Sequence, residues 1–225
     1  MRPRSHLLAV GVIWLLFAVA LGGCCAFNTV QPLKKAKALA GQHDYAALAA
    51  IEIKCNASCE GCNQLHLLKG DACFRLAKAD QAPEPHYRCA ADELMAGIRL
   101  TRDWQMENFD LNRTQTYINL CEAQRNRRDL LSGSEAEAVN ARLLASAQAF
   151  LAAEPGNPCG LYFESNAKYA QLRKCLLHPE NCPALCSQLQ AMRRSLEQTA
   201  AGACAAQISN LKADIKGAEQ FARCR

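Results

Sequence analysis

Alanine and leucine dominate this 225-residue chain, with 40 alanines and 29 leucines. Both residues favour helices, whereas the β-branched and aromatic residues that strands prefer are scarce. The chain has only 12 glycines and 8 prolines, which excludes collagen-like, low-complexity and disordered classes. The composition therefore predicts an all-α protein, either one domain with a sizeable core or a short stack of helical repeats.

The first residues have the three parts of a secretory signal. Arg2 and Arg4 precede an uninterrupted apolar run over residues 7–21, and small residues follow the run. The run has 15 residues, whereas a membrane span needs roughly 20. A cleaved signal is therefore favoured, and a retained signal anchor is the alternative.

The tetrapeptide Leu21-Gly22-Gly23-Cys24 resembles the bacterial lipobox, in which the cysteine is acylated and becomes the mature N-terminus. The resemblance implies a lipoprotein signal peptide over residues 1–23 and a lipidated tether over residues 24–31. Acyl chains such as palmitate on Cys24 would form a stable anchor, because each buried methylene contributes about 0.8 kcal/mol. In Gram-negative lipoproteins an aspartate after the lipidated cysteine favours the inner membrane, but Cys25 stands there. The resemblance therefore implies a lipid anchor in the outer membrane, with the chain on the periplasmic side.

The net charge gives no support to a nucleic-acid partner. The whole chain carries a formal charge of +5, and losing two arginines with the signal leaves +3, which is too small to indicate such a partner. The densest basic run, residues 125–128, closes a predicted helix. Cations there complement the helix dipole and hydrate the surface, so we interpret this run as a solvated helix end.

The chain has 14 cysteines, and setting aside the adjacent pair at residues 24 and 25 leaves 12. In an exported protein this even number favours a disulfide framework of up to six bridges. Two cysteines equally far from the loop of an antiparallel helical hairpin can come within the roughly 7 Å that a bridge requires. This rule suggests three pairs: Cys73–Cys89, Cys175–Cys186 and Cys182–Cys224. In the last two pairs, Cys182 and Cys186 compete with each other for partners.

Cys55, Cys59 and Cys62 form a close cluster that permits other chemistry. Their spacing matches the iron–sulfur motif of radical S-adenosylmethionine enzymes, but such enzymes need a reducing compartment and a large α/β barrel. A zinc site would need thiolates and a further ligand such as His43 or His66. We expect disulfides here, and no metal or cofactor. The alternative function is an extracytoplasmic metal- or thiol-handling protein that uses this cluster.

Apolar residues recur at offsets of three and four through most of the mature chain, which predicts paired helices. The first unit, residues 32–54, has a break at 41–44 that predicts a helix, a tight turn and a second helix. Ser134 and Glu137 have the spacing of a capping box. The later helical units are expected over residues 63–100, 110–153, 158–200 and 203–224, with a longer connection over 101–109.

Two stretches resemble tetratricopeptide repeats. Residues 38–48 (ALAGQHDYAAL) resemble the turn inside one repeat, and residues 149–158 (AFLAAEPGNP) resemble the join between two repeats. Asn157 as N-cap and Pro158 at the first helical position suit the start of a helix. The resemblance implies that residues 32–225 form one right-handed α-solenoid of tetratricopeptide-like helical hairpins, cross-linked by disulfides.

The same resemblance implies a groove that holds a segment of a partner protein. We therefore expect a membrane-anchored, periplasm-facing lipoprotein that acts as a protein-binding scaffold in envelope complex assembly. We expect no enzymatic activity, because the chain lacks the nucleophile-elbow and phosphate-loop motifs. Helical phase suggests six residues that contact the partner: Tyr117, Asn119, Arg125, Tyr162, Asn166 and Tyr169. The alternative for the three tyrosines is that they fill gaps between helices. A structural spacer with no specific ligand is a further alternative.

Overall fold

The structure, a computed structural model, describes residues 26–80, 83–104, 112–178, 182–199 and 202–224. Within these ranges every regular element is a helix, which confirms the predicted all-α class. The predicted signal peptide, Cys24 and Cys25 lie outside the described residues, and no described helix is both long and apolar enough to cross a membrane. The elements are a π-helical turn η1 (Ala26–Val30) and the α-helices α2 (Gln31–Gly41), α3 (Tyr45–Ala49), α4 (Cys62–Ala79), α5 (Glu84–Leu100), α6 (Arg113–Leu130), α7 (Gly133–Ala153), α8 (Pro158–Leu177), α9 (Leu185–Glu197) and α10 (Ala205–Phe221).

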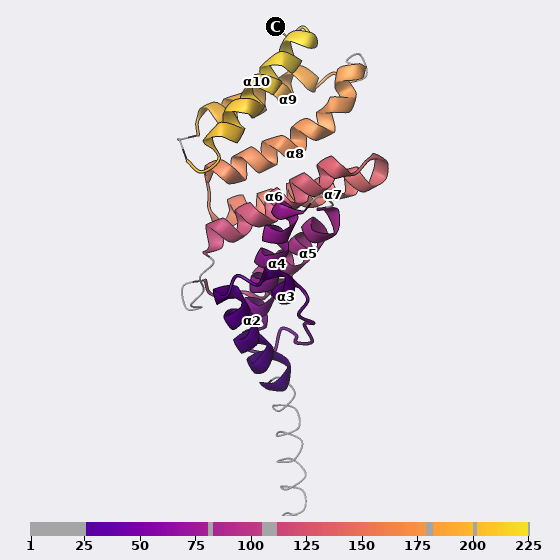
Figure 1. Ribbon diagram of the computed structural model, residues 1–225. Coiled ribbons are helices and arrows are strands. Elements are labelled where there is room, and N and C mark those ends of the chain that lie inside the picture. The colour runs from indigo at the N-terminus through magenta and orange to yellow at the C-terminus, as the bar shows by residue number, and fades with distance from the viewer. Residues whose placement is uncertain (1–25, 81–82, 105–111, 179–181, 200–201, 225) are drawn as a thin grey trace, which may run out of the picture.

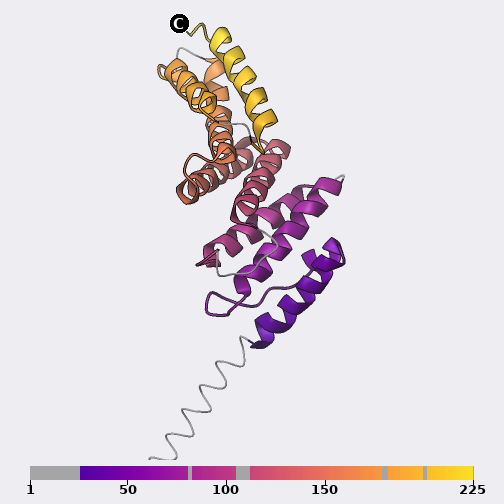
Figure 2. The same cartoon turned by 90° about the vertical axis from the view of Figure 1, so that its left-hand side faces the viewer.

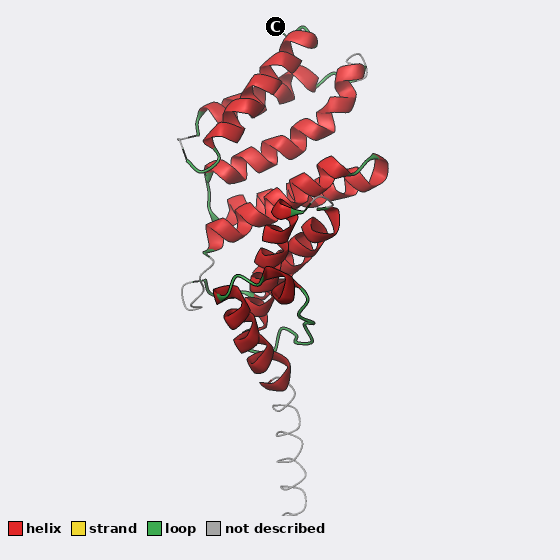
Figure 3. Cartoon of the chain, viewed as in Figure 1, coloured by secondary structure: helices red, strands yellow, loops and turns green. Residues whose placement is uncertain are grey.

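The helices follow one another along the long axis of an elongated molecule (Figures 1 and 2). From α4 onward each helix packs on the helices before and after it in the sequence, α2 packs on both α3 and α4, and further contacts join α4 to α6, α6 to α8 and α8 to α10. Short, fully described loops join α2 to α3, α6 to α7 and α7 to α8, as Figure 3 shows. Three buried apolar clusters succeed one another along this stack: the first joins α2, α3 and α4, the second joins α4, α5 and α6, and the third runs from α6 to α10.

The first helical unit differs from its prediction, because α3 ends at Ala49 and the second helix does not reach residue 54. Residues 51–56 are outside any regular element. Ile51, at 8% exposure, packs in the first apolar cluster together with Ile53. β-branched side chains suit such an extended path, which leads the chain to the start of α4.

Of two predicted helix starts, one is confirmed and one is wrong. Asn157 caps α8, where its Oδ1 accepts hydrogen bonds from the backbone nitrogens of Cys159 (2.9 Å) and Gly160 (3.3 Å). The capping box at Ser134 does not form, because α7 already begins at Gly133. Glu137 instead forms an ion pair with Lys174 on α8. The spacing of Ser134 and Glu137 correctly places a carboxylate near the start of the helix. It does not show that this carboxylate pairs with Lys174 on the next helix.

Five disulfides cross-link the described residues: Cys55–Cys62, Cys73–Cys89, Cys159–Cys204, Cys175–Cys182 and Cys186–Cys224. The Cys73–Cys89 pair is the predicted one. The predicted pairs Cys175–Cys186 and Cys182–Cys224 are wrong, because Cys182 bonds to Cys175 in the last turn of α8. Cys186, in the first turn of α9, instead bonds to Cys224, three residues after the end of α10.

The even number of cysteines, 12, suggested that all of them would be paired in up to six bridges. Among the described residues, however, Cys121 is free. Its side chain is fully buried on α6, and this burial raises the pKa of the thiol. A buried neutral thiol is a poor nucleophile and a poor metal ligand. Cys121 therefore acts as a small apolar core residue.

Glycines let α4 and α5 approach closely, and this contact gives a testable prediction. A Cβ atom at Gly97 would lie 2.5 Å from Leu67 Cδ2 on α4, whereas a Cβ atom at Gly217 on α10 would meet nothing within 4 Å. We expect Gly97→Ala to lower the free energy of unfolding by about 1–3 kcal/mol through overpacking. Gly217→Ala should raise it by up to about 1 kcal/mol through helix propensity. Urea unfolding followed by helical circular dichroism checks both, and a gain in stability for Gly97→Ala would contradict the close contact.

Candidate functional site

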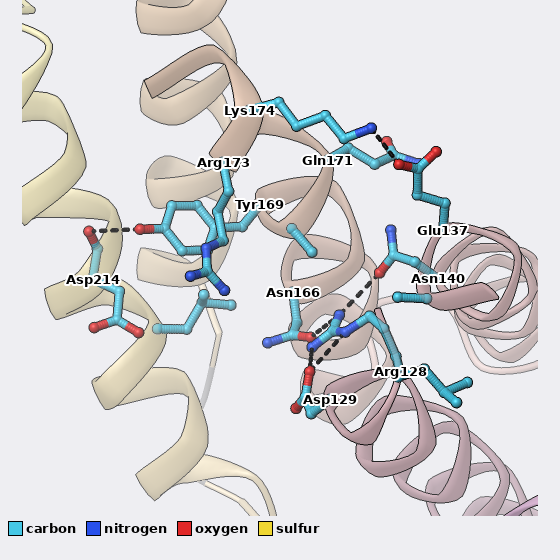
Figure 4. A pocket seen from close by; sticks show the side chains of 14 residues that line it. Arg128, Asp129, Glu137, Asn140, Asn166, Tyr169, Gln171, Arg173, Lys174 and Asp214 are labelled. Carbon is cyan, nitrogen blue, oxygen red and sulfur yellow. Dashed lines mark hydrogen bonds and ion pairs between the residues drawn. The ribbon is translucent and has the colours of Figure 1, made fainter. Parts of the chain in front are cut away.

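A cleft of about 1030 Å³ lies where three parts of the stack meet. The end of α6 and the start of α7 form one side, the second half of α8 forms the middle, and α10 forms the other side (Figure 4). Its charged residues are balanced, with three cations, Arg128, Arg173 and Lys174, and three acids, Asp129, Glu137 and Asp214. Two further clefts have volumes of about 430 and 420 Å³.

Arg128 holds one side of this cleft in a fixed arrangement. Its Nη1 donates hydrogen bonds to Asn140 Oδ1 on α7 and Asn166 Oδ1 on α8, each at 2.9 Å. Its Nε and Nη2 donate to Asp129 Oδ1 at 2.9 and 2.7 Å. Asn140, itself buried, donates from Nδ2 to the carbonyl oxygen of Ala167 at 2.9 Å. Because nearly all its donors are occupied, Arg128 ties α6, α7 and α8 together rather than offering a free charge.

The opposite side of the cleft carries groups that remain available. Tyr169 donates a hydrogen bond of 3.3 Å from its hydroxyl to the backbone oxygen of Asp214 on α10. Burial, followed by the negative charge of Asp214, raises the pKa of Tyr169, so the phenol stays protonated at neutral pH. Neither the Arg173 guanidinium nor the Asp214 carboxylate forms an ion pair within 4.0 Å with another described residue. Figure 4 shows both residues next to Tyr169.

The described lining of the cleft is rich in side chains that can form hydrogen bonds and ion pairs. Its described lining includes no serine, cysteine or histidine. Amide, guanidinium, carboxylate and phenol groups converge instead. Such groups recognise the backbone and the polar side chains of a peptide.

Two of the six residues predicted to contact a partner line this cleft, namely Asn166 and Tyr169. Tyr117 is only 7% exposed and its ring stacks on Phe150 with centroids 5.0 Å apart, so it fills the core. Asn119 is buried and donates from Nδ2 to Asp71 Oδ1 at 3.1 Å, which links α6 to α4. These two predictions are corrected, because helical phase does not distinguish a groove from a helix contact.

Arg125 and Tyr162 bind each other rather than facing a groove. Arg125 Nη1 donates to the Tyr162 hydroxyl at 2.7 Å, and Tyr162 is only 5% exposed. The interpretation of residues 125–128 as a solvated helix end is therefore wrong. Arg127 and Arg128 side chains are only 15% and 11% exposed, and both are held by partners on other helices or loops. The sequence signal that was missed is the excess of arginine over lysine, because arginine suits multiply bonded, partly buried sites.

The cysteine cluster at the start of α4 is oxidised in the structure. Cys55 and Cys62 are bonded to each other, with Cα atoms 5.8 Å apart, and Cys59 is also in a disulfide. His43 lies apart, with its Nδ1 2.9 Å from the Tyr45 hydroxyl. The structure therefore contains no free thiol at this cluster.

No protein-family model, curated protein or solved structure matches the chain.

Proposed function

We propose that the chain is an exported scaffold that binds a segment of a partner protein in the cleft between α6, α7, α8 and α10. The observation that carries the proposal is the arrangement of this cleft, in which Arg128 fixes one side and Arg173 and Asp214 form no ion pair with another described residue. A volume of about 1030 Å³ suits several residues of a peptide, since drug-sized ligands occupy clefts of about 300–1,000 Å³.

The charges of the cleft define the kind of segment that fits. An acidic side chain would pair with Arg173, a basic side chain with Asp214, and backbone groups with Asn166 and Tyr169. Because cations and acids are equal in number in the cleft, a polar segment of mixed charge suits it better than a strongly acidic or basic one.

The successive packing of the helices supports the fold proposed from the sequence, a right-handed α-solenoid of tetratricopeptide-like hairpins. In such a stack each unit contacts mainly its neighbours, which agrees with the contacts of α4 to α10. The five disulfides support an oxidising compartment, since bridges persist mainly outside the cytoplasm. We therefore propose an envelope lipoprotein, anchored through Cys24 in the outer membrane and without enzymatic activity.

Photo-crosslinking in intact cells tests the proposal. A photoreactive amino acid replaces Gln171, which is exposed and lines the cleft, or Gln148, an exposed glutamine of α7 outside it. We expect light-dependent adducts with a discrete protein from position 171 and none from position 148. Adding Arg173→Glu should weaken the adduct at least several-fold, because it reverses a charge in the cleft. Equal adducts from both positions, or none from position 171, would overturn the proposal.

A further inference from the structure

The start of α4 brings together three residues whose side chains can bind a metal ion. One ligand atom from each of Cys55, Cys62 and His66 lies within 4.8 Å of the other two. Cys62 and His66 are four residues apart on α4, so their side chains lie on the same face of the helix. Cys55 comes from the extended segment before the helix. This cluster is separate from the proposed binding cleft.

The surroundings of His66 match those of a metal-binding histidine. His66 Nδ1 lies 2.6 Å from Glu93 Oε2 on α5, and Lys69 Nζ lies 2.9 Å from the other oxygen of Glu93. With Nδ1–H donating to the carboxylate, the lone pair is on Nε2, the atom left to bind a metal. Metal-bound histidines commonly donate their second ring nitrogen to a carboxylate in this way, which fixes the ring and strengthens the ligand.

We propose that opening the Cys55–Cys62 disulfide converts this cluster into a Zn²⁺ site. The ligands would be the two sulfur atoms and His66 Nε2, with water in the fourth position. Two thiolates and one imidazole suit zinc, and three protein ligands leave one position open. While the disulfide is closed the sulfurs are not thiolates, so the redox state of one bond controls metal binding.

A dithiol is the reductant that opens the Cys55–Cys62 disulfide. The dithiol transfers two electrons and two protons, so the S–S bond breaks, Cys55 and Cys62 become thiols and the dithiol becomes a disulfide. Zn²⁺ then displaces one proton from each thiol, and both protons go to solvent.

The chain offers an internal control. Cys175–Cys182 closes a loop with the same sequence separation, 7 residues, as Cys55–Cys62. Among the described residues, the cysteines of this second bridge belong to no cluster with a third metal-binding side chain. Zinc should therefore distinguish the two pairs once both are reduced.

Differential alkylation of the full mature chain tests the proposal. The protein is treated with dithiothreitol, separated from it without oxygen, checked for helical circular dichroism, and alkylated with iodoacetamide with or without Zn²⁺. Mass spectrometry then gives the rate at each cysteine. We expect Zn²⁺ to slow alkylation of Cys55 and Cys62 at least tenfold and to leave Cys175 and Cys182 unchanged.

Variants separate a zinc site from simple protection by structure. His66→Ala should abolish the protection, and Glu93→Gln should weaken zinc affinity about 10- to 100-fold. His43→Ala, which changes an exposed histidine elsewhere, should leave it intact. The proposal would be overturned by equal protection of both cysteine pairs, by no protection, or by protection that survives His66→Ala. It would also be overturned if Cys55–Cys62 stays closed while Cys175–Cys182 opens.

Discussion

Replacing Phe150 with alanine should lower the free energy of unfolding by about 3–5 kcal/mol, the usual cost of removing a buried aromatic side chain. Phe150 is 0% exposed on α7, in the largest apolar cluster, and its ring is stacked on Tyr117 at an interplanar angle of 4°. The substitution removes this stacking and leaves a cavity between α6, α7 and α8. Urea unfolding, followed by helical circular dichroism with the disulfides intact, measures the loss.

Phe221→Ala is the matched control for this loss. Phe221 ends α10 and is 70% exposed, so its removal should change the free energy of unfolding by less than about 0.5 kcal/mol. Equal effects of the two substitutions would show that the cluster around Phe150 is not packed as described.

Removing the Cys159–Cys204 bridge should also be strongly destabilising. This disulfide joins the first turn of α8 to the residue before α10, across a sequence separation of 45 residues. The loop-closure relation gives a loss of about 4 kcal/mol for a loop of this length, because the unfolded chain gains freedom. The bridge is removed in the double variant Cys159→Ala/Cys204→Ala. Alanine is chosen rather than serine because serine would bury a hydroxyl at each of these positions, which are 3% and 4% exposed.

The short bridge Cys175–Cys182 provides the comparison. With a separation of 7 residues, its removal should cost about 2 kcal/mol by the same relation. Thermal or urea unfolding of both double alanine variants gives the difference. A loss for the short bridge as large as that for the long one would contradict the role assigned to loop length.

The sequence allowed prediction of features that depend on neighbouring residues. Asn157 followed by Pro158 identifies the start of α8 because capping is a local interaction. The Cys73–Cys89 bridge was predictable because α4 and α5 both continue up to one short connection, so positions equally far from it face each other.

Features that depend on distant packing were not predictable in the same way. The pairing of Cys182 required knowing where α8 ends, and the role of Arg128 required knowing that Asn140 and Asn166 flank it. Periodicity shows which face of a helix is apolar but not which polar residues on the other face meet a neighbouring helix. Tyr117 and Asn119 are examples. Their helical phase suggested that they face a groove, but both are buried between helices.

We propose that this chain is exported and lipidated, and that it acts outside the cytoplasm as a disulfide-linked scaffold. The most direct measurement is mass spectrometry of the chain taken from cells after acid quenching and alkylation. We expect a mature chain that begins at an acylated Cys24, with the five described bridges closed and Cys121 alkylated only after denaturation. A chain that retains residues 1–23, carries no acyl group and is alkylated at Cys73, Cys89, Cys159 and Cys204 without a reductant would contradict it.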